Sequence, residues 1–288
     1  MSLAVDTAES LTDSRPGHWK LWLRQIGAIF RLEIAKNFLN RRSIPMYLLA
    51  LLPLFPLALI ALVEPPGNNW SNFNDLSQIY SFIYNGLILR TLLFFGSAWI
   101  FMNLFRGELV DRSLHYYFLS AVRREVLVFA KYISGLVTSI VLFTTTTVLS
   151  LLILYLPHFY LQSGRSFIEG RGLSHLLSYA GITVLACVGY GAFFLVVGLF
   201  VRNPIIPAVL LYGWEWLNFL LPALLKKISV IHYLNSLVPV PLSEGPFAVV
   251  VEPTPASIAI PSMLVVTLLV LMLAGYRIRH MEIRYGSD

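Results

Sequence analysis

Ionisable side chains are scarce in this 288-residue chain. Asp, Glu, Lys and Arg make up 12% of the residues, whereas hydrophobic residues make up 57% and the mean hydropathy is +0.72. The single cysteine, Cys187, excludes an intramolecular disulfide and metal sites built on paired cysteines. The six histidines show no H-x-x-x-H or H-E-x-x-H spacing, and neither G-x-S-x-G nor G-x-x-x-x-G-K-[ST] occurs. The sequence therefore lacks the usual signatures of a zinc site, a serine hydrolase or a phosphate-binding loop, and we predict no metal site and no catalytic residue.

What the chain does contain is a row of long apolar stretches. Each is near the length of about 20 residues that a helix needs to cross the hydrocarbon core of a bilayer. We therefore predict an all-α integral membrane protein with six transmembrane helices, at about 44–63, 86–105, 133–156, 176–201, 204–225 and 258–276. The segment 226–257 is expected outside the membrane, with two apolar patches that form short helices or a re-entrant piece.

The basic residues are divided unevenly among the loops. Sixteen Lys and Arg fall on the side that holds both termini, and four fall on the other side, with Arg90 inside a predicted span. Because cytoplasmic loops carry an excess of Lys and Arg, both termini are predicted to be cytoplasmic. The net charge of +6 is thus explained by topology, and no nucleic-acid partner is expected.

The polar N-terminal region divides into two parts. Residues 1–17 are predicted to be a disordered cytoplasmic tail, and 18–42 an amphipathic helix that precedes the transmembrane domain, 43–288. In that helix an apolar side chain recurs every fourth residue, and basic side chains occupy other faces. This pattern is typical of a helix lying in the membrane interface. The alternative is a soluble helix packed on a partner.

The segment between the second and third spans carries the most specific pattern. A helix over 107–120 would place four polar side chains on one face and apolar ones on the other; the polar ones are Glu108, Asp111, Arg112 and His115. Glu108 and Arg112 are four residues apart in the favourable acid-first order. Such a cytoplasmic helix suits docking to a soluble partner.

This pattern resembles the membrane subunit of type 2 ABC transporters (ABC-2-like exporters). In that family a Glu opens this loop, followed by a basic residue, an apolar run, an Arg-plus-acid pair and a Lys entering the next span. The matching positions are Glu108, Arg112, Leu119, Arg123 or Arg124, Glu125 and Lys131. The N-terminal helix, the six spans and the large outer segment also look like that family, so the resemblance covers nearly the whole chain.

The resemblance implies a permease subunit in the plasma (inner) membrane of a prokaryote. Two permeases, as a homodimer or with a related chain, would each contact an ATP-binding cassette ATPase subunit through Glu108–Ser120 and the basic pair Arg123 and Arg124. ATP and Mg would bind to that ATPase and none to this chain, which is then not an enzyme by itself. Alternating access in the spans would export an amphipathic or lipid-like substrate among the membrane lipids.

Two ionisable residues lie within predicted spans, where burying a charge is costly. Glu215 lies near the midplane between Trp214 and Trp216, with Asn218 close by. It is either a structural hydrogen-bond acceptor or part of a substrate path in which the tryptophans stack on the cargo. Arg90 either extends to the outer interface or pairs with Glu215 or with an anionic substrate.

Two other classes of function remain open. A membrane-embedded lipid-modifying enzyme would need an interfacial cluster of Asp, Glu or His, and these residues are sparse. A non-transporting membrane assembly factor would keep the same spans. A copurifying ATPase discriminates the permease from both.

Overall fold

The computed structural model describes residues 18–63, 73–110, 124–158, 167, 171–201, 203, 205–241, 249 and 251–279, and every structural statement below refers to them. These residues are almost entirely helical, and no strand occurs among them. The all-α class predicted from the sequence is therefore confirmed.

Five of the helical segments are long and apolar enough to cross a membrane: Ile44–Val63, Phe73–Phe105, Val126–Tyr155, Arg171–Phe200 and Ala256–Ile278. They overlap five of the six predicted spans. The first is bent, because α3 (Ile44–Leu51) ends just before Pro53 and α4 (Leu54–Val63) begins just after it. Proline has no N–H to donate and disfavours a continuous helix.

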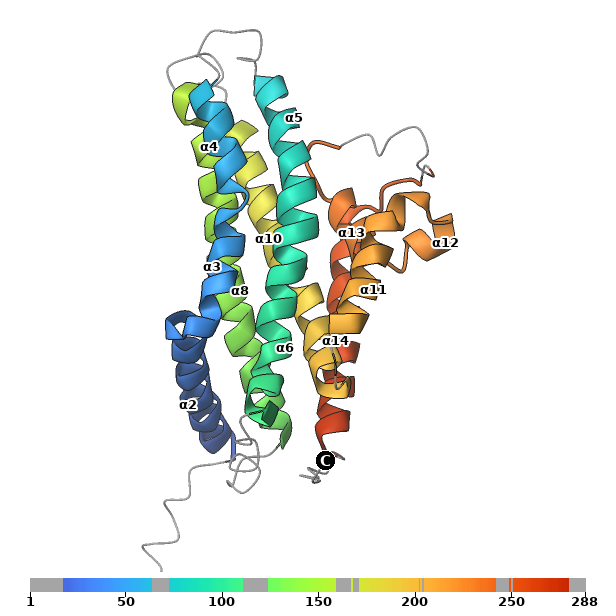
Figure 1. Ribbon diagram of the computed structural model, residues 1–288. Coiled ribbons are helices and arrows are strands. Elements are labelled where there is room, and N and C mark those ends of the chain that lie inside the picture. Colours follow the sequence, from blue (N-terminus) through green and yellow to red (C-terminus); the bar gives the residue numbers. More distant parts are fainter. Residues whose placement is uncertain are drawn as a thin grey trace, which may run out of the picture.

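The second long segment consists of three consecutive helical pieces. These are α5 (Phe73–Ile83), the π-helical η2 (Tyr84–Leu93) and α6 (Phe94–Val110). The remaining three are α8 (Arg124–Tyr155), α10 (Arg171–Phe200) and α14 (Ala256–Arg279). Figure 1 shows them running side by side, with α10 in contact with α6, α8 and α14.

The predicted span at 204–225 is not one continuous helix. Helix α11 (Ile205–Trp216) continues as one 3-10 turn, η4 (Leu217–Leu220), and the chain then turns at Leu221, which is extended (φ −73°, ψ 147°). The cause is Pro222, because a proline pushes the preceding residue out of the helical region. At about 1.5 Å per α-helical and 2.0 Å per 3-10 residue, this piece is about 26 Å long, less than a core of about 30 Å.

Two short helices follow the turn, α12 (Ala223–Lys226) and α13 (Val230–Ser236). Helix α13 packs against α10, α14 and η2, and its Ile231 and Leu234 are fully buried. The segment 226–257, for which short helices or a re-entrant piece outside the membrane were predicted, thus contains a short helix that packs into the bundle.

Helix α2 (His18–Leu39) lies against the lower part of α8 (Figure 1). It shares this end of the bundle with the last turn of α6, the first turn of α8 and the last turn of α14 (Figure 1). The first and last described helices, α2 and α14, therefore both reach the same end of the bundle.

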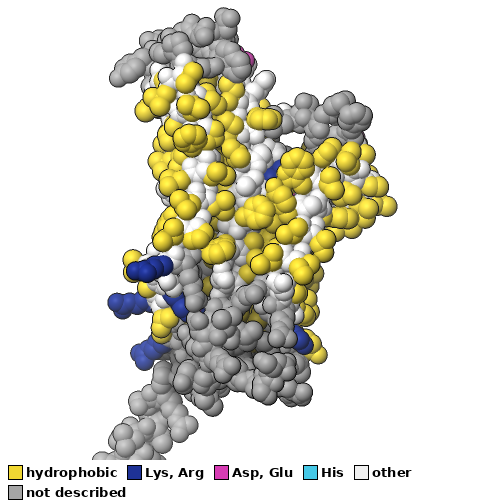
Figure 2. Space-filling view, in the orientation of Figure 1, with side chains coloured by type: hydrophobic (Ala, Val, Ile, Leu, Met, Phe, Trp, Pro, Cys, Tyr) yellow, Lys and Arg dark blue, Asp and Glu magenta, His cyan; other side chains and the backbone are white. Residues whose placement is uncertain are grey.

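The outer surface is apolar over the long helices and basic near α2. Figure 2 shows hydrophobic side chains covering the upper and middle parts of this face and Lys or Arg side chains gathered at the lower end. Phe55, Leu62 and Leu210 are 75%, 84% and 70% exposed, respectively. Exposed apolar surface on this scale marks an interaction with lipid or with another chain. The architecture is compatible with a multi-pass membrane protein.

Glycines permit close contact between the long helices. The Phe101 ring of α6 lies between Gly135 of α8 and Gly191 of α10, and a Cβ at Gly191 would stand 2.5 Å from that ring. A Cβ at Gly198 would stand 3.0 Å from the backbone of Met102. Small residues at such positions let membrane helices approach one another, so α6, α8 and α10 form the packed centre of the bundle.

Candidate functional site

The structure places Glu215 on α11, facing the interior with 4% of its surface exposed. Its carboxylate accepts hydrogen bonds from Ser229 Oγ (2.7 Å), from the backbone N of Val230 (3.1 Å) and of Ile231 (2.9 Å), and from Tyr190 Oη (3.4 Å). All four are neutral groups. Glu215 is therefore held by donors from α10 and from the start of α13.

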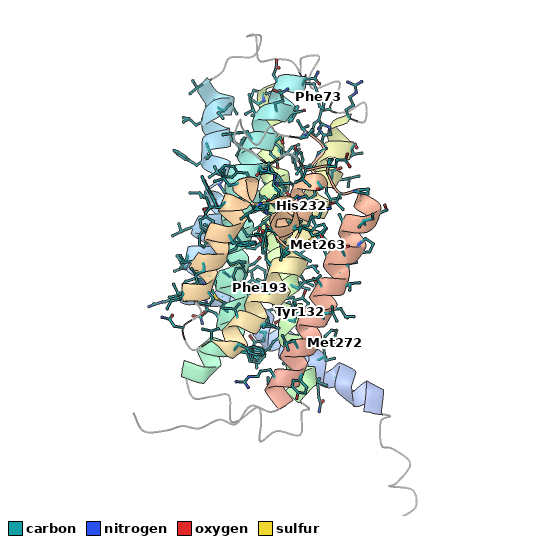
Figure 3. All side chains as sticks on the ribbon, turned by 90° about the vertical axis from the view of Figure 1, so that its right-hand side faces the viewer. Phe73, Tyr132, Phe193, His232, Met263 and Met272 are labelled. Atoms are coloured by element: carbon teal, nitrogen blue, oxygen red, sulfur yellow. The ribbon has the colours of Figure 1, made fainter. Side chains whose placement is uncertain are left out.

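The position of Glu215 follows from how α13 begins. The first N–H groups of any helix lack partners within the helix and need an acceptor. Ser229 precedes α13 in an extended conformation, but its side chain makes no capping bond to its own helix. The carboxylate of Glu215 takes the N–H groups of Val230 and Ile231 instead. In Figure 3, His232 marks α13 among the long helices. This geometry favours the structural interpretation of Glu215; a contact with substrate stays a prediction.

Arg90 connects η2 to α11 directly and to α13 through Asn85. In η2, Arg90 Nε donates to Asn85 Oδ1 (3.1 Å), five residues earlier, as the wider π-helical turn allows. Its Nη1 donates to the carbonyl of Trp216 on α11 (3.3 Å). Asn85 in turn donates to Asn235 Oδ1 on α13 (2.9 Å). The side chain of Arg90 is half-buried.

Arg90 and Glu215 do not form an ion pair within the described residues, where the ion pair found joins two other side chains. The pairing that the sequence suggested is thus not seen, because each group is engaged by other neighbours. Pairing of Arg90 with an anionic substrate stays a prediction.

The neighbours of Glu215 on α11 serve different purposes. Trp216 is 48% exposed and Trp214 is half-buried. Asn218 is 1% exposed and donates from Nδ2 to the carbonyl of Lys226 (3.3 Å), which holds the turn after α11. The tryptophans therefore do not both face the carboxylate, and Asn218 stabilises the chain reversal at Pro222.

The residues predicted to contact an ATPase fall largely outside the described part of the chain. Asp111, Arg112, His115 and Arg123 lie outside it. Glu108 and Arg124 belong to the helical backbone at the end of α6 and the start of α8. Of the predicted coupling helix 107–120, the part up to Val110 is continuous with α6.

A second polar site, of which the sequence singled out Lys131 but not Glu33, lies where α2, α6 and α8 meet. Lys131 Nζ of α8 is 2.7 Å from Glu33 Oε1 of α2 and 2.9 Å from the carbonyl oxygen of Leu104 of α6. The side chains of Lys131 and Glu33 are 0% and 2% exposed. The ammonium also lies 5.3 Å from the centre of the Phe105 ring. We call these four residues the three-helix junction.

Hydroxyl groups connect the long helices in the other half of the bundle. Tyr80 Oη lies 3.1 Å from Ser150 Oγ, and Thr183 Oγ1 lies 3.0 Å from Tyr84 Oη and 3.1 Å from Thr147 Oγ1. All five side chains are buried. Hydrogen bonds of this kind join membrane helices to one another, and they tie α5 and η2 to α8 and α10.

Among the described residues, no group of three or more His, Cys, Asp or Glu could hold a metal ion. No family model, curated protein or solved structure matches this chain. Its function must therefore be inferred from the geometry of the two polar sites and from the sequence.

Proposed function

We propose that this chain is the permease subunit of an ATP-driven ABC exporter in the plasma membrane of a prokaryote. The observation that carries the proposal is the three-helix junction. It lies at the end of the bundle where α6 and α8 bracket the segment that resembles the family's ATPase-coupling loop. A permease needs a rigid connection between that loop and its spans.

The junction supplies a rigid connection of this kind. The Lys131 ammonium holds the carbonyl of Leu104 and the carboxylate of Glu33 at once, so α2, α6 and α8 are bound at one point. Because both charges are buried, separating them would expose an unpaired charge to a low-dielectric interior. A displacement of the coupling loop would then move α6 and α8 with α2, rather than bending the loop alone.

The rest of the proposed assembly follows from the resemblance. ATP and Mg bind to a separate ATPase subunit, and a second permease completes the pathway. The cargo is amphipathic or lipid-like, which is supported by how few charged side chains the long apolar helices carry. In this scheme Glu215 and Arg90 hold α13 in place beside the pathway.

The proposal is tested by purifying wild type and Glu108→Arg from detergent-solubilised membranes and identifying the proteins that copurify with each. Glu252→Arg is the matched control, because Glu252 is exposed in the segment before α14, away from the junction. We expect an ATP-binding cassette protein and ATPase activity to copurify with wild type and with Glu252→Arg, and both to be reduced in Glu108→Arg. Failure of any ATPase to copurify with wild type would overturn the proposal and favour a lipid-modifying enzyme or an assembly factor.

A further inference from the structure

The face of α2 that points away from the bundle is strongly basic. Arg24, Arg31 and Lys36 are exposed, and Arg41 is exposed in the short 3-10 helix η1 (Arg41–Ser43) that follows. The one acidic residue of α2, Glu33, is buried and paired with Lys131. On the described part of α2 the acidic side chain thus lies on the buried side, and these basic side chains lie on the exposed side.

Apolar side chains lie among these basic ones. Leu32 is 55% exposed and Leu39 is 86% exposed. A helix that presents leucines and basic residues on one surface binds the boundary between lipid headgroups and acyl chains. The position fits, because α3, the first apolar segment, begins at Ile44, five residues after α2 ends. In Figure 2 the basic side chains lie directly below the apolar surface.

At this boundary a cavity of about 60 Å³ opens between α2 and α6. Its polar lining includes Lys36, Asn37 and Asn40 from α2 and the residue after it, and Asn103 from α6. Trp99 and Met46 provide apolar walls on the side toward the spans. Trp99 is 43% exposed, as is usual for tryptophans at a membrane interface. We call this cavity the α2–α6 notch.

We propose that the α2–α6 notch binds the headgroup of an anionic phospholipid. The phosphate enters among the amide groups of Asn40 and Asn103, and the Lys36 ammonium balances its charge. The acyl chains then lie along Trp99 of α6 and Leu48 of α3, which are 43% and 64% exposed. The combination of donors, charge and apolar wall matches the three parts of a phospholipid.

The proposed lipid would act on the same helix as the three-helix junction and next to it. Glu33 lines the notch and is bonded to Lys131. A bound headgroup would therefore join α2 to α6 beside the junction and make the position of α2 depend on the lipid composition. This inference does not rest on the proposed transport function.

The test uses full-length protein in a neutral detergent, with palmitoyl-oleoyl phosphatidylglycerol as the anionic probe and the matching phosphatidylcholine as the neutral one. Native mass spectrometry counts bound lipid, and thermal unfolding measures stabilisation. We expect phosphatidylglycerol to be retained and to raise the Tm, and phosphatidylcholine to do neither. Each Lys or Arg side chain near an anionic headgroup strengthens binding about fivefold. Lys36→Gln should therefore weaken phosphatidylglycerol binding by about that factor.

Two further variants locate the site. Asn103→Leu fills the notch without changing the charge, and it should abolish retention of phosphatidylglycerol, a larger effect than that of Lys36→Gln. Lys227→Gln removes an exposed lysine that lies after α12, away from the notch, and should bind like wild type. Equal retention of both lipids by wild type, or unchanged binding in Asn103→Leu, would overturn the proposal. The Tm of each variant without added lipid shows whether it is folded.

Discussion

Glu33 on α2 faces a lysine, whereas Glu215 on α11 faces only neutral donors. Both carboxylates are nearly inaccessible, with 2% and 4% of their surfaces exposed. Glu33 is held by one short contact with the Lys131 ammonium, and Glu215 by two hydroxyl groups and two backbone N–H groups. The chain thus uses two different solutions to the problem of burying a carboxylate.

The two solutions act over different distances in the sequence. Glu33 and Lys131 are 98 residues apart and join the N-terminal helix to the third long segment. Three of the four donors to Glu215 lie 14 to 16 residues away at the start of α13 and shape one chain reversal, and the fourth, Tyr190, is 25 residues away. We infer that the first carboxylate determines how helices are assembled, and that the second determines the local path of the chain.

The largest effect is expected from removing the cation of the junction. Lys131→Met leaves the Glu33 carboxylate buried without a partner, and breaking a buried ion pair in this way costs about 3–5 kcal/mol. The Tm measured in detergent should fall sharply. Lys227→Met is the control, because Lys227 is exposed and its loss should change the Tm little.

A second substitution distinguishes the charge pair from simple packing. Glu33→Leu combined with Lys131→Met removes both charges, and replacing a buried pair by apolar side chains is often nearly neutral. The double variant should therefore be more stable than Lys131→Met alone. The single variant Glu33→Leu completes the cycle. If the stability loss of the double variant equals the sum of the losses in Glu33→Leu and Lys131→Met, the two side chains do not depend on each other, and the comparison with Glu215 fails.

A smaller effect is expected at Glu215. Glu215→Leu leaves two N–H groups and two hydroxyl groups without their acceptor, and each buried orphan of this kind costs about 1–3 kcal/mol. Because the hydroxyl groups can turn toward other acceptors, we expect a total loss of about 2–4 kcal/mol. The loss of folding free energy is read from chemical unfolding in detergent.

Glu215→Gln is the matched variant, because it keeps one acceptor oxygen and nearly the same shape. It should lose about half as much stability as Glu215→Leu. Should Glu215→Gln be as stable as wild type but no longer transport the cargo, the carboxylate would have a role in the pathway beyond holding α13.

The long spans could be predicted from the sequence, because apolar length can be measured directly along a chain. The exception was 204–225, which was predicted as one span although a proline such as Pro222 can break a helix. Its neighbour Leu221 is extended, and the helix ends there. A proline inside an apolar stretch is tolerated when neighbouring helices supply partners, so its position alone does not decide between a bend and an end.

The two buried carboxylates differ in how far the sequence could identify them. Glu215 attracted notice because it interrupts an apolar stretch, but its donors could not be identified before the position of α13 was known. Glu33 was missed because it lies in a helix whose apolar stripe was expected to face lipid. In the structure, Ile29 and Glu33 form the buried face of α2. The isolated acid in a basic helix was a signal for Glu33, and Lys131 had been singled out by the family pattern, but the two are 98 residues apart and nothing in the sequence paired them.

The smallest predicted effect comes from one donor to Glu215. Ser229→Ala removes the 2.7 Å hydroxyl bond but leaves the N–H groups of Val230 and Ile231 on the carboxylate. A single hydrogen bond contributes about 1 kcal/mol, so the unfolding free energy should fall by about that amount. Ser134→Ala is the control, because the buried Ser134 hydroxyl bonds only a carbonyl of its own helix, that of Lys131. Equal losses in the two variants would show that the Ser229 hydroxyl contributes no more than a hydroxyl that merely bonds its own helix, and that the other three donors hold Glu215 without it.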